Sequence, residues 1–95
     1  MVSGATVSNN SDAARYEVNL DGAPAGFAAY RLRDNRVIFT HTEVDSAFEG
    51  HGLGSALARG ALDDVRERGL RAVPLCPFIA AYIERHPEYQ DLVAG

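Results

Sequence analysis

The sequence predicts a single α/β (α+β) domain in which helices pack on a mixed sheet. Alternating apolar and polar residues fill much of the first half of the chain, as in strands with one buried face. After residue 52 the apolar residues recur at helical spacing, which indicates helices. The 95 residues are 46% hydrophobic and 23% charged, which is ordinary for one globular domain.

The domain is expected to span residues 14–95. Residues 1–13 are mostly small and polar, so we expect a disordered tail there. No repeat, linker or second domain is apparent in the remainder of the sequence.

Three strands with tight turns should form an antiparallel meander. The sequence Asp21-Gly22 is a strong hairpin signal, and Asp34-Asn35 supplies the second turn. The third run is rich in β-branched and aromatic residues. The expected strands are residues 16–20, 25–33 and 36–44.

A helix, a strand and a second helix should follow the meander. Gly69 suits the C-terminal cap of the first helix, and Pro77 suits the first turn of the second. Pro74 should end or splay the intervening strand. Because a helix connects them, this strand should lie parallel to the third. The expected elements are a helix of about four turns from residue 53, a strand at 70–75 and a helix at 78–85.

Composition excludes several functional classes. The net charge is −4 and no basic stripe is visible, so nucleic-acid binding is not expected. No run of 18 apolar residues exists and no secretory signal is visible, so we expect no membrane partner and a cytoplasmic location. Cys76 is the single cysteine, and the three histidines lack metal-ligand spacing, so no metal is expected. A monomer is plausible at this size.

The segment 49–55, Glu-Gly-His-Gly-Leu-Gly-Ser, is the densest functional signal. Glycines before a helix let a ligand approach the backbone, where unpaired N–H groups favour a phosphate. A dinucleotide fingerprint would need glycine at position 55, where serine stands, and a P-loop would need lysine, which the chain lacks. A tight turn without a ligand is the alternative interpretation.

Several segments in order resemble the GNAT superfamily of acyl-CoA-dependent N-acetyltransferases. The glycine segment fits its phosphate loop except at Glu49, where glutamine or arginine is usual. The resemblance is greatest to a minimal single-domain group, the small YjdJ-like acetyltransferases, and covers about residues 16–93. The other matching segments are His41-Thr42-Glu43-Val44, Pro74-Leu75-Cys76-Pro77-Phe78, Tyr82-Ile83 and His86-Pro87-Glu88-Tyr89.

The resemblance implies a compact GNAT-like fold that binds acetyl-CoA (coenzyme A) as co-substrate. The pyrophosphate should meet backbone N–H groups of the glycine segment, and the pantetheine should lie between the third and fourth expected strands. Glu49 would repel the pyrophosphate unless its side chain faces solvent. The residues implied in binding are Val44, Glu49, Gly50, His51, Gly52, Leu53, Gly54, Ser55, Cys76 and Tyr82.

Two residues are candidate bases. Glu43 is expected to share a strand side with His41, Phe39 and Val37, and an otherwise apolar side would raise its pKa so that it could act as a base. The pKa of His41 is ordinarily near neutral. The alternative for Glu43 is a solvated acid at a strand end, and the alternative for His41 is a surface residue or a cross-strand pairing residue.

Two further candidates should lie near the thioester. Cys76 could carry the acetyl group transiently, helped by the start of the second helix, or could be a small buried hydrophobe. Tyr82 occupies a position where the resemblance implies a tyrosine that protonates the thiolate; a core tyrosine is the alternative.

The sequence therefore predicts an N-acetyltransferase that moves an acetyl group to a primary amine. The acceptor could be a protein lysine, an N-terminus, a peptide or a small amine. A non-catalytic acyl-CoA-binding or sensing module is the second hypothesis, and an interaction module without a ligand is the third.

Overall fold

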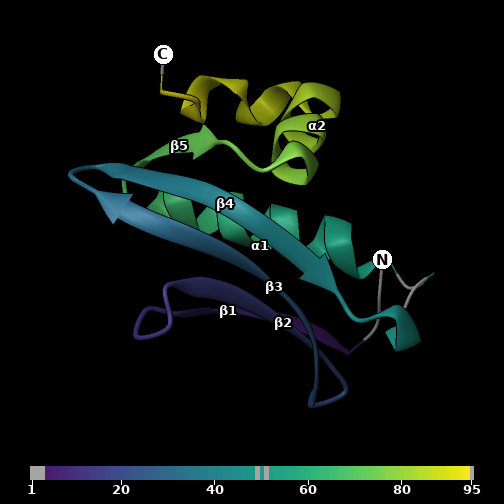
Figure 1. Ribbon diagram of the computed structural model, residues 1–95. Coiled ribbons are helices and arrows are strands. Elements are labelled where there is room, and N and C mark those ends of the chain that lie inside the picture. The colour runs from purple at the N-terminus through teal and green to yellow at the C-terminus, as the bar shows by residue number, and fades with distance from the viewer. Residues whose placement is uncertain (1–3, 49, 51, 95) are drawn as a thin grey trace.

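A computed structural model describes residues 4–48, 50 and 52–94. Five strands form one sheet in the order β1-β2-β3-β4-β5, with β1 to β4 antiparallel and β4 parallel to β5 (Figure 1). The strands are β1 (Ala5–Asn10), β2 (Arg15–Leu20), β3 (Ala23–Arg33), β4 (Arg36–Val44) and β5 (Arg71–Pro74). The helices are α1 (Leu53–Glu67) and α2 (Pro77–Arg85), with 3-10 segments η1 (Ser46–Phe48) and η2 (Pro87–Leu92).

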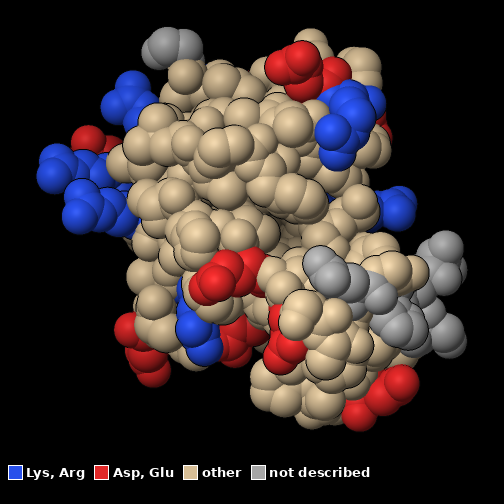
Figure 2. Space-filling model, turned by 45° about the vertical axis from the view of Figure 1, so that its right-hand side comes forward, with Lys and Arg blue, Asp and Glu red and all other residues tan. Residues whose placement is uncertain are grey.

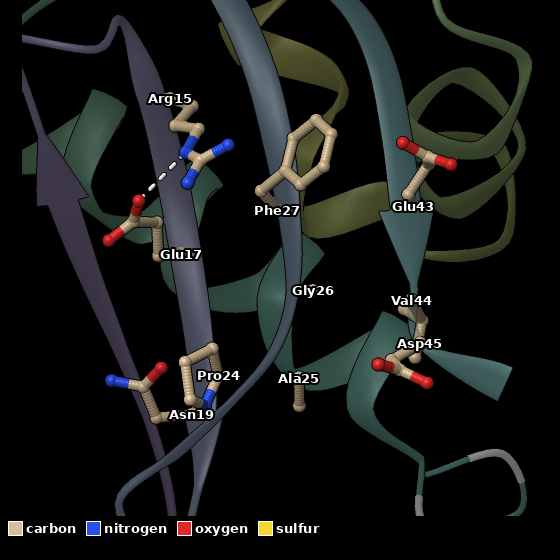
Figure 3. A pocket seen from close by; sticks show the side chains of 10 residues that line it. All are labelled: Arg15, Glu17, Asn19, Pro24, Ala25, Gly26, Phe27, Glu43, Val44 and Asp45. Atoms are coloured by element: carbon tan, nitrogen blue, oxygen red, sulfur yellow. Dashed lines mark hydrogen bonds and ion pairs between the residues drawn. The ribbon is translucent and has the colours of Figure 1, made fainter. Parts of the chain in front are cut away.

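The meander, the crossover through α1 and the parallel β4–β5 pair confirm the predicted α/β architecture. Gly69 follows the end of α1 with a φ of 69°, and Pro77 begins α2, as the sequence predicts. Helix α1 contacts all five strands, and α2 packs against α1, β4 and β5. Both helices lie behind the sheet in the view of Figure 3.

The expected tail is wrong for residues 5–10, which form β1 and pair with β2. The reason is a period-2 pattern built from small residues, in which Ala5 and Val7 pack partly buried against the core. Val7 meets α1 at Gly60, where a Cβ atom would lie 2.7 Å from the Val7 Cβ. The Tyr30 hydroxyl also donates a hydrogen bond to the Asn9 side chain at 2.7 Å. Strand β1 is therefore an integral part of the sheet.

The core lies between the sheet and the helices. Two buried tyrosines place their hydroxyl groups at the edge of the core, where each has a hydrogen-bond partner. The Tyr16 hydroxyl donates a hydrogen bond to the Asp64 carboxylate and the Tyr89 hydroxyl to the Asp63 carboxylate, each at 2.7 Å. The largest fully buried side chains are Tyr16, Val18, Val37, Phe39, Leu53, Leu57, Leu62, Val65 and Ile79.

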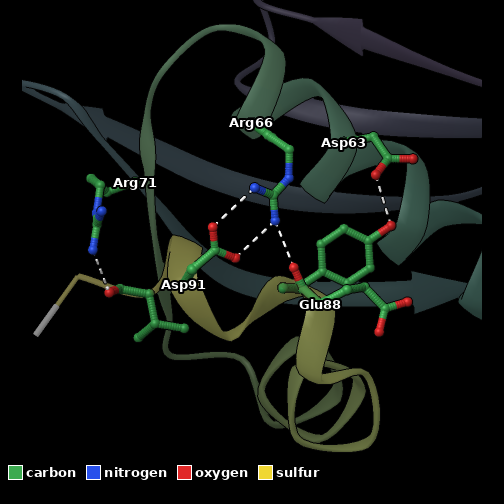
Figure 4. Close-up of polar contacts among 7 residues, drawn as sticks. Asp63, Arg66, Arg71, Glu88 and Asp91 are labelled. Atoms are coloured by element: carbon green, nitrogen blue, oxygen red, sulfur yellow. Dashed lines mark hydrogen bonds and ion pairs between the residues drawn. The ribbon is translucent and has the colours of Figure 1, made fainter.

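Segment η2 is fastened to the end of α1 by polar contacts (Figure 4). Arg66 donates hydrogen bonds to both carboxylate oxygens of Asp91, at 3.0 and 2.8 Å, and to the Glu88 carbonyl at 2.6 Å. Arg71 donates to the Val93 carbonyl at 2.9 Å. The Arg66 guanidinium holds the pKa of the Asp91 carboxyl below its usual value. These contacts hold the C-terminal segment beside the helices.

In the part of the chain that the structure describes, no helix is long and apolar enough to cross a membrane.

Candidate functional site

Strands β4 and β5 part at the centre of the candidate site. Their pairing ends at Phe39 and Pro74. The Phe39 carbonyl accepts hydrogen bonds from the N–H groups of both Leu75 and Cys76, at 3.1 and 2.9 Å, as the chain turns away into α2. Strand β4 continues to Val44, and beyond Phe39 the edge of β4 that faces β5 has no ladder partner in β5. Such an edge can offer backbone N–H groups to a ligand.

A β-bulge at this point changes which side chains face the helices. His41 pairs with Ala29 and Phe39 pairs with Tyr30, so Thr40 is an extra residue in β4. A bulge reverses the side-chain alternation of the strand beyond it. Phe39 is fully buried against the helices, whereas His41 and Glu43 are exposed on the opposite face.

The shared strand side expected for Glu43, His41, Phe39 and Val37 is therefore wrong. The Glu43 side chain is 61% exposed and lies 3.4 Å from the Nε2 atom of His41. Glu43 therefore lacks the apolar surroundings that were expected to raise its pKa. The two candidate bases do lie together, at the open face of β4.

Cys76 lies at the start of α2 and faces the gap between the strands. It is 3% exposed, and its thiol donates a hydrogen bond to the Thr42 hydroxyl, with 3.2 Å between Sγ and Oγ1. Thr42 points toward the helices because of the bulge. The side chain of Cys76 thus spans from α2 to the part of β4 that has no β5 partner.

The glycine segment 49–55, called the glycine loop below, is described at Gly50 and at residues 52–55, where it leads into α1. Two of its glycines have a backbone geometry that only glycine adopts freely. Gly50 and Gly52 have φ values of 87° and 69°. Gly52 is the N-terminal cap of α1, no side chain caps the helix, and the first helical hydrogen bond runs from Ala56 to the Gly52 carbonyl. Among the described residues, the N–H groups of Leu53, Gly54 and Ser55 have no hydrogen-bond partner, so the first turn of α1 can bind an anion.

Gly54 has a packing role that the sequence does not reveal. A Cβ atom there would lie 2.8 Å from the Phe78 ring. The start of α2 thus packs directly on the start of α1, which brings the glycine loop and the Cys76 segment to one site. The side chain of Leu53 is buried in the core, so only its backbone faces the loop. Glu49 and His51 lie outside the described residues.

Tyr82 lies about one turn further along α2 than Phe78, on the same side of the helix. Its ring is 4% exposed and stacks on His86 at 3.9 Å between ring centroids. Burial raises the pKa of the Tyr82 phenol above its ordinary value, while the nearby charge of Arg59 lowers it in part. The phenol therefore keeps its proton at neutral pH. His86 fixes this arrangement through a 2.8 Å contact between its Nδ1 atom and the Tyr82 carbonyl.

A groove of about 560 Å³ lies on the open face of β2, β3 and β4, next to Glu43 (Figure 3). Sequence reasoning missed it because its shape depends on strand register and on two bulges, one in β4 and one near Val18. Its lining residues are Arg15, Glu17, Asn19, Pro24, Ala25, Gly26, Phe27, Glu43, Val44 and Asp45. The usable signal in the sequence was a glycine, Gly26, inside an expected strand, which often marks a close approach of another backbone. In the structure a Cβ atom at this position would lie 2.5 Å from the Glu43 carbonyl oxygen.

Comparison with known proteins identifies the family. A family model described as GCN5-related N-acetyl-transferase matches residues 15–92. The chain belongs to the GCN5-related N-acetyltransferase family. The resemblance seen in the sequence is thereby confirmed, and membership supports acyl transfer as the general type of activity.

Relatives and a solved structure agree with this assignment. The chain is 34% identical over 80 residues to Protein NATD1 of Mus musculus, covering 82% of this chain and 73% of that protein. It is equally similar to Protein NATD1 of Homo sapiens, covering 71% of that protein. The fold matches the NMR structure of a GCN5-like protein from Staphylococcus aureus, with a TM-score of 0.71, 24% identity, and coverage of 98% of this chain and 91% of that one. This last match confirms the GNAT-like fold.

Proposed function

We propose that this chain is an N-acetyltransferase that moves an acetyl group from acetyl-CoA to a primary amine. The observation that carries the proposal is the convergence of three features at one site. The glycine loop leads into α1, and the pairing of β4 with β5 ends nearby. The packing of Phe78 on Gly54 holds the start of α2 against the start of α1, so these two regions lie at one site. A phosphate-bearing thioester needs an anion site and an adjacent stretch of unpaired backbone, and the first turn of α1 and the edge of β4 beyond Phe39 can serve as these.

The pyrophosphate of acetyl-CoA would bind the free N–H groups of Gly54 and Ser55 and the backbone of Gly50 and Gly52. The absence of an acidic residue from the first turn of α1 favours this. Arg59, exposed on α1, can add a positive charge. The pantetheine would follow the edge of β4 beyond Phe39, where β5 no longer pairs with it, and bring the thioester beside Val44 and Cys76.

Acetyl transfer in this site would proceed by direct attack. The amine nitrogen forms a bond to the carbonyl carbon of the thioester, and the carbon–sulfur bond to CoA breaks. Backbone N–H groups on the unpaired edge of β4 would stabilise the negative charge on the carbonyl oxygen. The Tyr82 phenol would give its proton to the departing CoA thiolate.

The proton of the amine would go to the Glu43 carboxylate, with His41 beside it at 3.4 Å. Both side chains lie on the open face of β4, whereas Thr42 and Cys76 lie on the helix side. The two substrates would therefore approach β4 from opposite faces of the sheet. The acceptor amine would thus stay exposed to solvent on the open face of β4, while acetyl-CoA would bind from the helix side.

The test is a CoA-release assay with an amine acceptor, together with acetyl-CoA binding by the same proteins. We expect Glu43→Gln and Tyr82→Phe each to lower kcat/KM by about tenfold or more. The Kd for acetyl-CoA should change by less than about twofold, because neither side chain is needed to hold the pyrophosphate. Glu67→Gln, which removes the same charge at the far end of α1, should match the unmodified protein.

The second hypothesis, a non-catalytic acyl-CoA binder, predicts a different result. Acetyl-CoA would bind, but release of CoA with any amine would not exceed the uncatalysed rate. Glu43→Gln and Tyr82→Phe would then have no effect on that rate. This outcome would overturn acetyl transfer and leave the binding site intact.

A further inference from the structure

The groove beside Glu43 has the size and the charge of a binding site for a small cation. Its volume of about 560 Å³ falls within the range of small-molecule pockets. It lies over β2 and β3, which are hydrogen-bonded to neighbouring strands on both sides. Over these two strands the groove offers side chains to a ligand and no free strand edge, which suits a small molecule better than an extended peptide.

The single basic side chain in the groove lining is already engaged. The Arg15 Nε atom lies 2.7 Å from the Glu17 carboxylate, and its guanidinium carbon lies 4.8 Å above the centre of the Phe27 ring (Figure 3). Glu17 also accepts a hydrogen bond from Asn10 at 3.1 Å. The positive charge of Arg15 is thus matched by Glu17, and the hydrogen bonds from Arg15 and Asn10 lower the pKa of that carboxyl.

Two carboxylates at the end of β4 make the groove negative. Glu43 faces His41 at 3.4 Å, and Asp45 accepts one hydrogen bond, from the Ala47 N–H at 2.9 Å. Both side chains are exposed. Figure 2 shows acidic side chains across the lower part of one face, with one basic side chain among them, while several basic side chains project from its left edge. Charge complementarity thus favours a cationic ligand.

We propose that the groove selects a small aliphatic diamine as the acetyl acceptor, an inference that rests on the proposed function. One nitrogen attacks the thioester as the neutral amine and passes a proton to Glu43 as the carbon–nitrogen bond forms. The second stays protonated and is held by the Asp45 carboxylate. The Phe27 ring supports the methylene chain between them. A monoamine of the same length lacks the second contact, so the groove distinguishes the two.

Binding can be tested without catalysis by amide NMR spectra of the full chain. We expect 1,4-diaminobutane to shift the signals of Gly26, Phe27, Val44 and Asp45. Butylamine, which has the same chain and one charge, should shift them only at about fivefold higher concentration or more. Equal effects of the two amines, or shifts that avoid this groove, would overturn the proposal even if acetyl transfer is established.

Turnover supplies the second test, with Asp45→Asn as the variant. Asparagine keeps an oxygen for the Ala47 N–H, so the local structure should be retained. The ratio of kcat/KM for 1,4-diaminobutane to that for butylamine should fall about fivefold, through KM. Asp34→Asn removes the same charge beyond the other end of β4 and should leave the ratio unchanged.

The outcomes separate this proposal from the one on which it rests. Acetylation of both amines at equal efficiency would overturn the diamine groove and keep the acetyltransferase. Preference for lysine peptides over 1,4-diaminobutane would also overturn it. Failure of acetyl-CoA to bind, with the NMR shifts by 1,4-diaminobutane still present, would overturn the acetyltransferase and keep a diamine site.

Discussion

The thiol of Cys76 donates a hydrogen bond to the hydroxyl of Thr42 across the gap between β4 and β5, with 3.2 Å between the two atoms. In the described part of the chain the Thr42 hydroxyl is the hydrogen-bonding partner of the Cys76 thiol. A hydroxyl is too weak a base to take the proton from a thiol and so make it a nucleophile. Under the proposed function Cys76 would therefore line the acetyl site, and the amine would attack the thioester directly.

The first prediction concerns this cysteine. Cys76→Ser keeps a hydrogen-bond donor for Thr42 and removes the nucleophilic sulfur. We expect kcat to stay within about threefold of that of the unmodified protein, because sulfur takes no part in direct transfer. Intact-protein mass spectrometry after incubation with acetyl-CoA alone should find no acetylated protein.

An acetyl-cysteine route would give the opposite result. The Cys76→Ser protein would then lose activity by about a hundredfold or more. The unmodified protein would also gain the mass of one acetyl group, located on Cys76 by peptide mapping.

The second prediction tests the glycine loop with a matched pair of variants. Gly52 and Gly69 flank α1, and both have a φ of 69°. Alanine at either position should cost about 1 kcal/mol of unfolding free energy, because a side chain disfavours this backbone conformation. Only Gly52→Ala should weaken acetyl-CoA binding beyond what its lost stability explains. Equal Kd values for the two variants in calorimetric titrations would contradict the proposed phosphate site.

The third prediction tests whether β1 belongs to the core. Gly60→Ala would bring a Cβ atom to 2.7 Å from the Val7 Cβ, so β1 must shift. We expect a loss of about 1–3 kcal/mol in urea unfolding, since overpacking outweighs the better helix propensity of alanine. Val7→Ala should reduce that loss when combined with Gly60→Ala. If Gly60→Ala instead stabilises the protein in both backgrounds, β1 does not pack on α1 as described.

The fourth prediction concerns alkaline stability. Burial, together with hydrogen bonds to Asp64 and Asp63, raises the pKa of Tyr16 and Tyr89 well above that of a free phenol. The folded protein keeps these protons where the unfolded chain releases them. The stability from these phenols is therefore complete below about pH 10 and is lost as the pH rises further.

Urea unfolding at increasing pH provides the measurement. Above about pH 10 the free energy of unfolding should fall by up to about 1.4 kcal/mol per pH unit for each of the two phenols. Tyr16→Phe should reduce the slope. Ionisation of all four tyrosines near the usual pKa, with the fold retained, would contradict the account.

Most of the fold follows from local signals in the sequence. The turns at Asp21-Gly22 and Asp34-Asn35, the change of period before α1 and the proline that opens α2 each act over a few residues. Strand β1 was not predictable in the same way. Its inward side chains are small, and it is held by Gly60 of α1 and by Tyr30 of β3, which are distant in the sequence.

The candidate site was predictable only in part. Glu43, His41, Cys76 and the glycine loop were identified from motifs, but the face of β4 that carries Glu43 depends on the bulge at Thr40. That bulge is a property of the β3–β4 register and has no signature in β4 alone. The groove depends on the same register, so its charges become a site only in three dimensions.

Calorimetric titration of the full chain with acetyl-CoA tests the central claim most directly, with ATP and NAD as controls. We predict saturable binding of acetyl-CoA at one site, which Gly52→Ala weakens and Gly69→Ala retains, and no comparable binding of the other two nucleotides. Absence of acetyl-CoA binding by the folded protein, or equal binding of all three nucleotides, would contradict the assignment of the glycine loop and the β4–β5 gap as an acyl-CoA site.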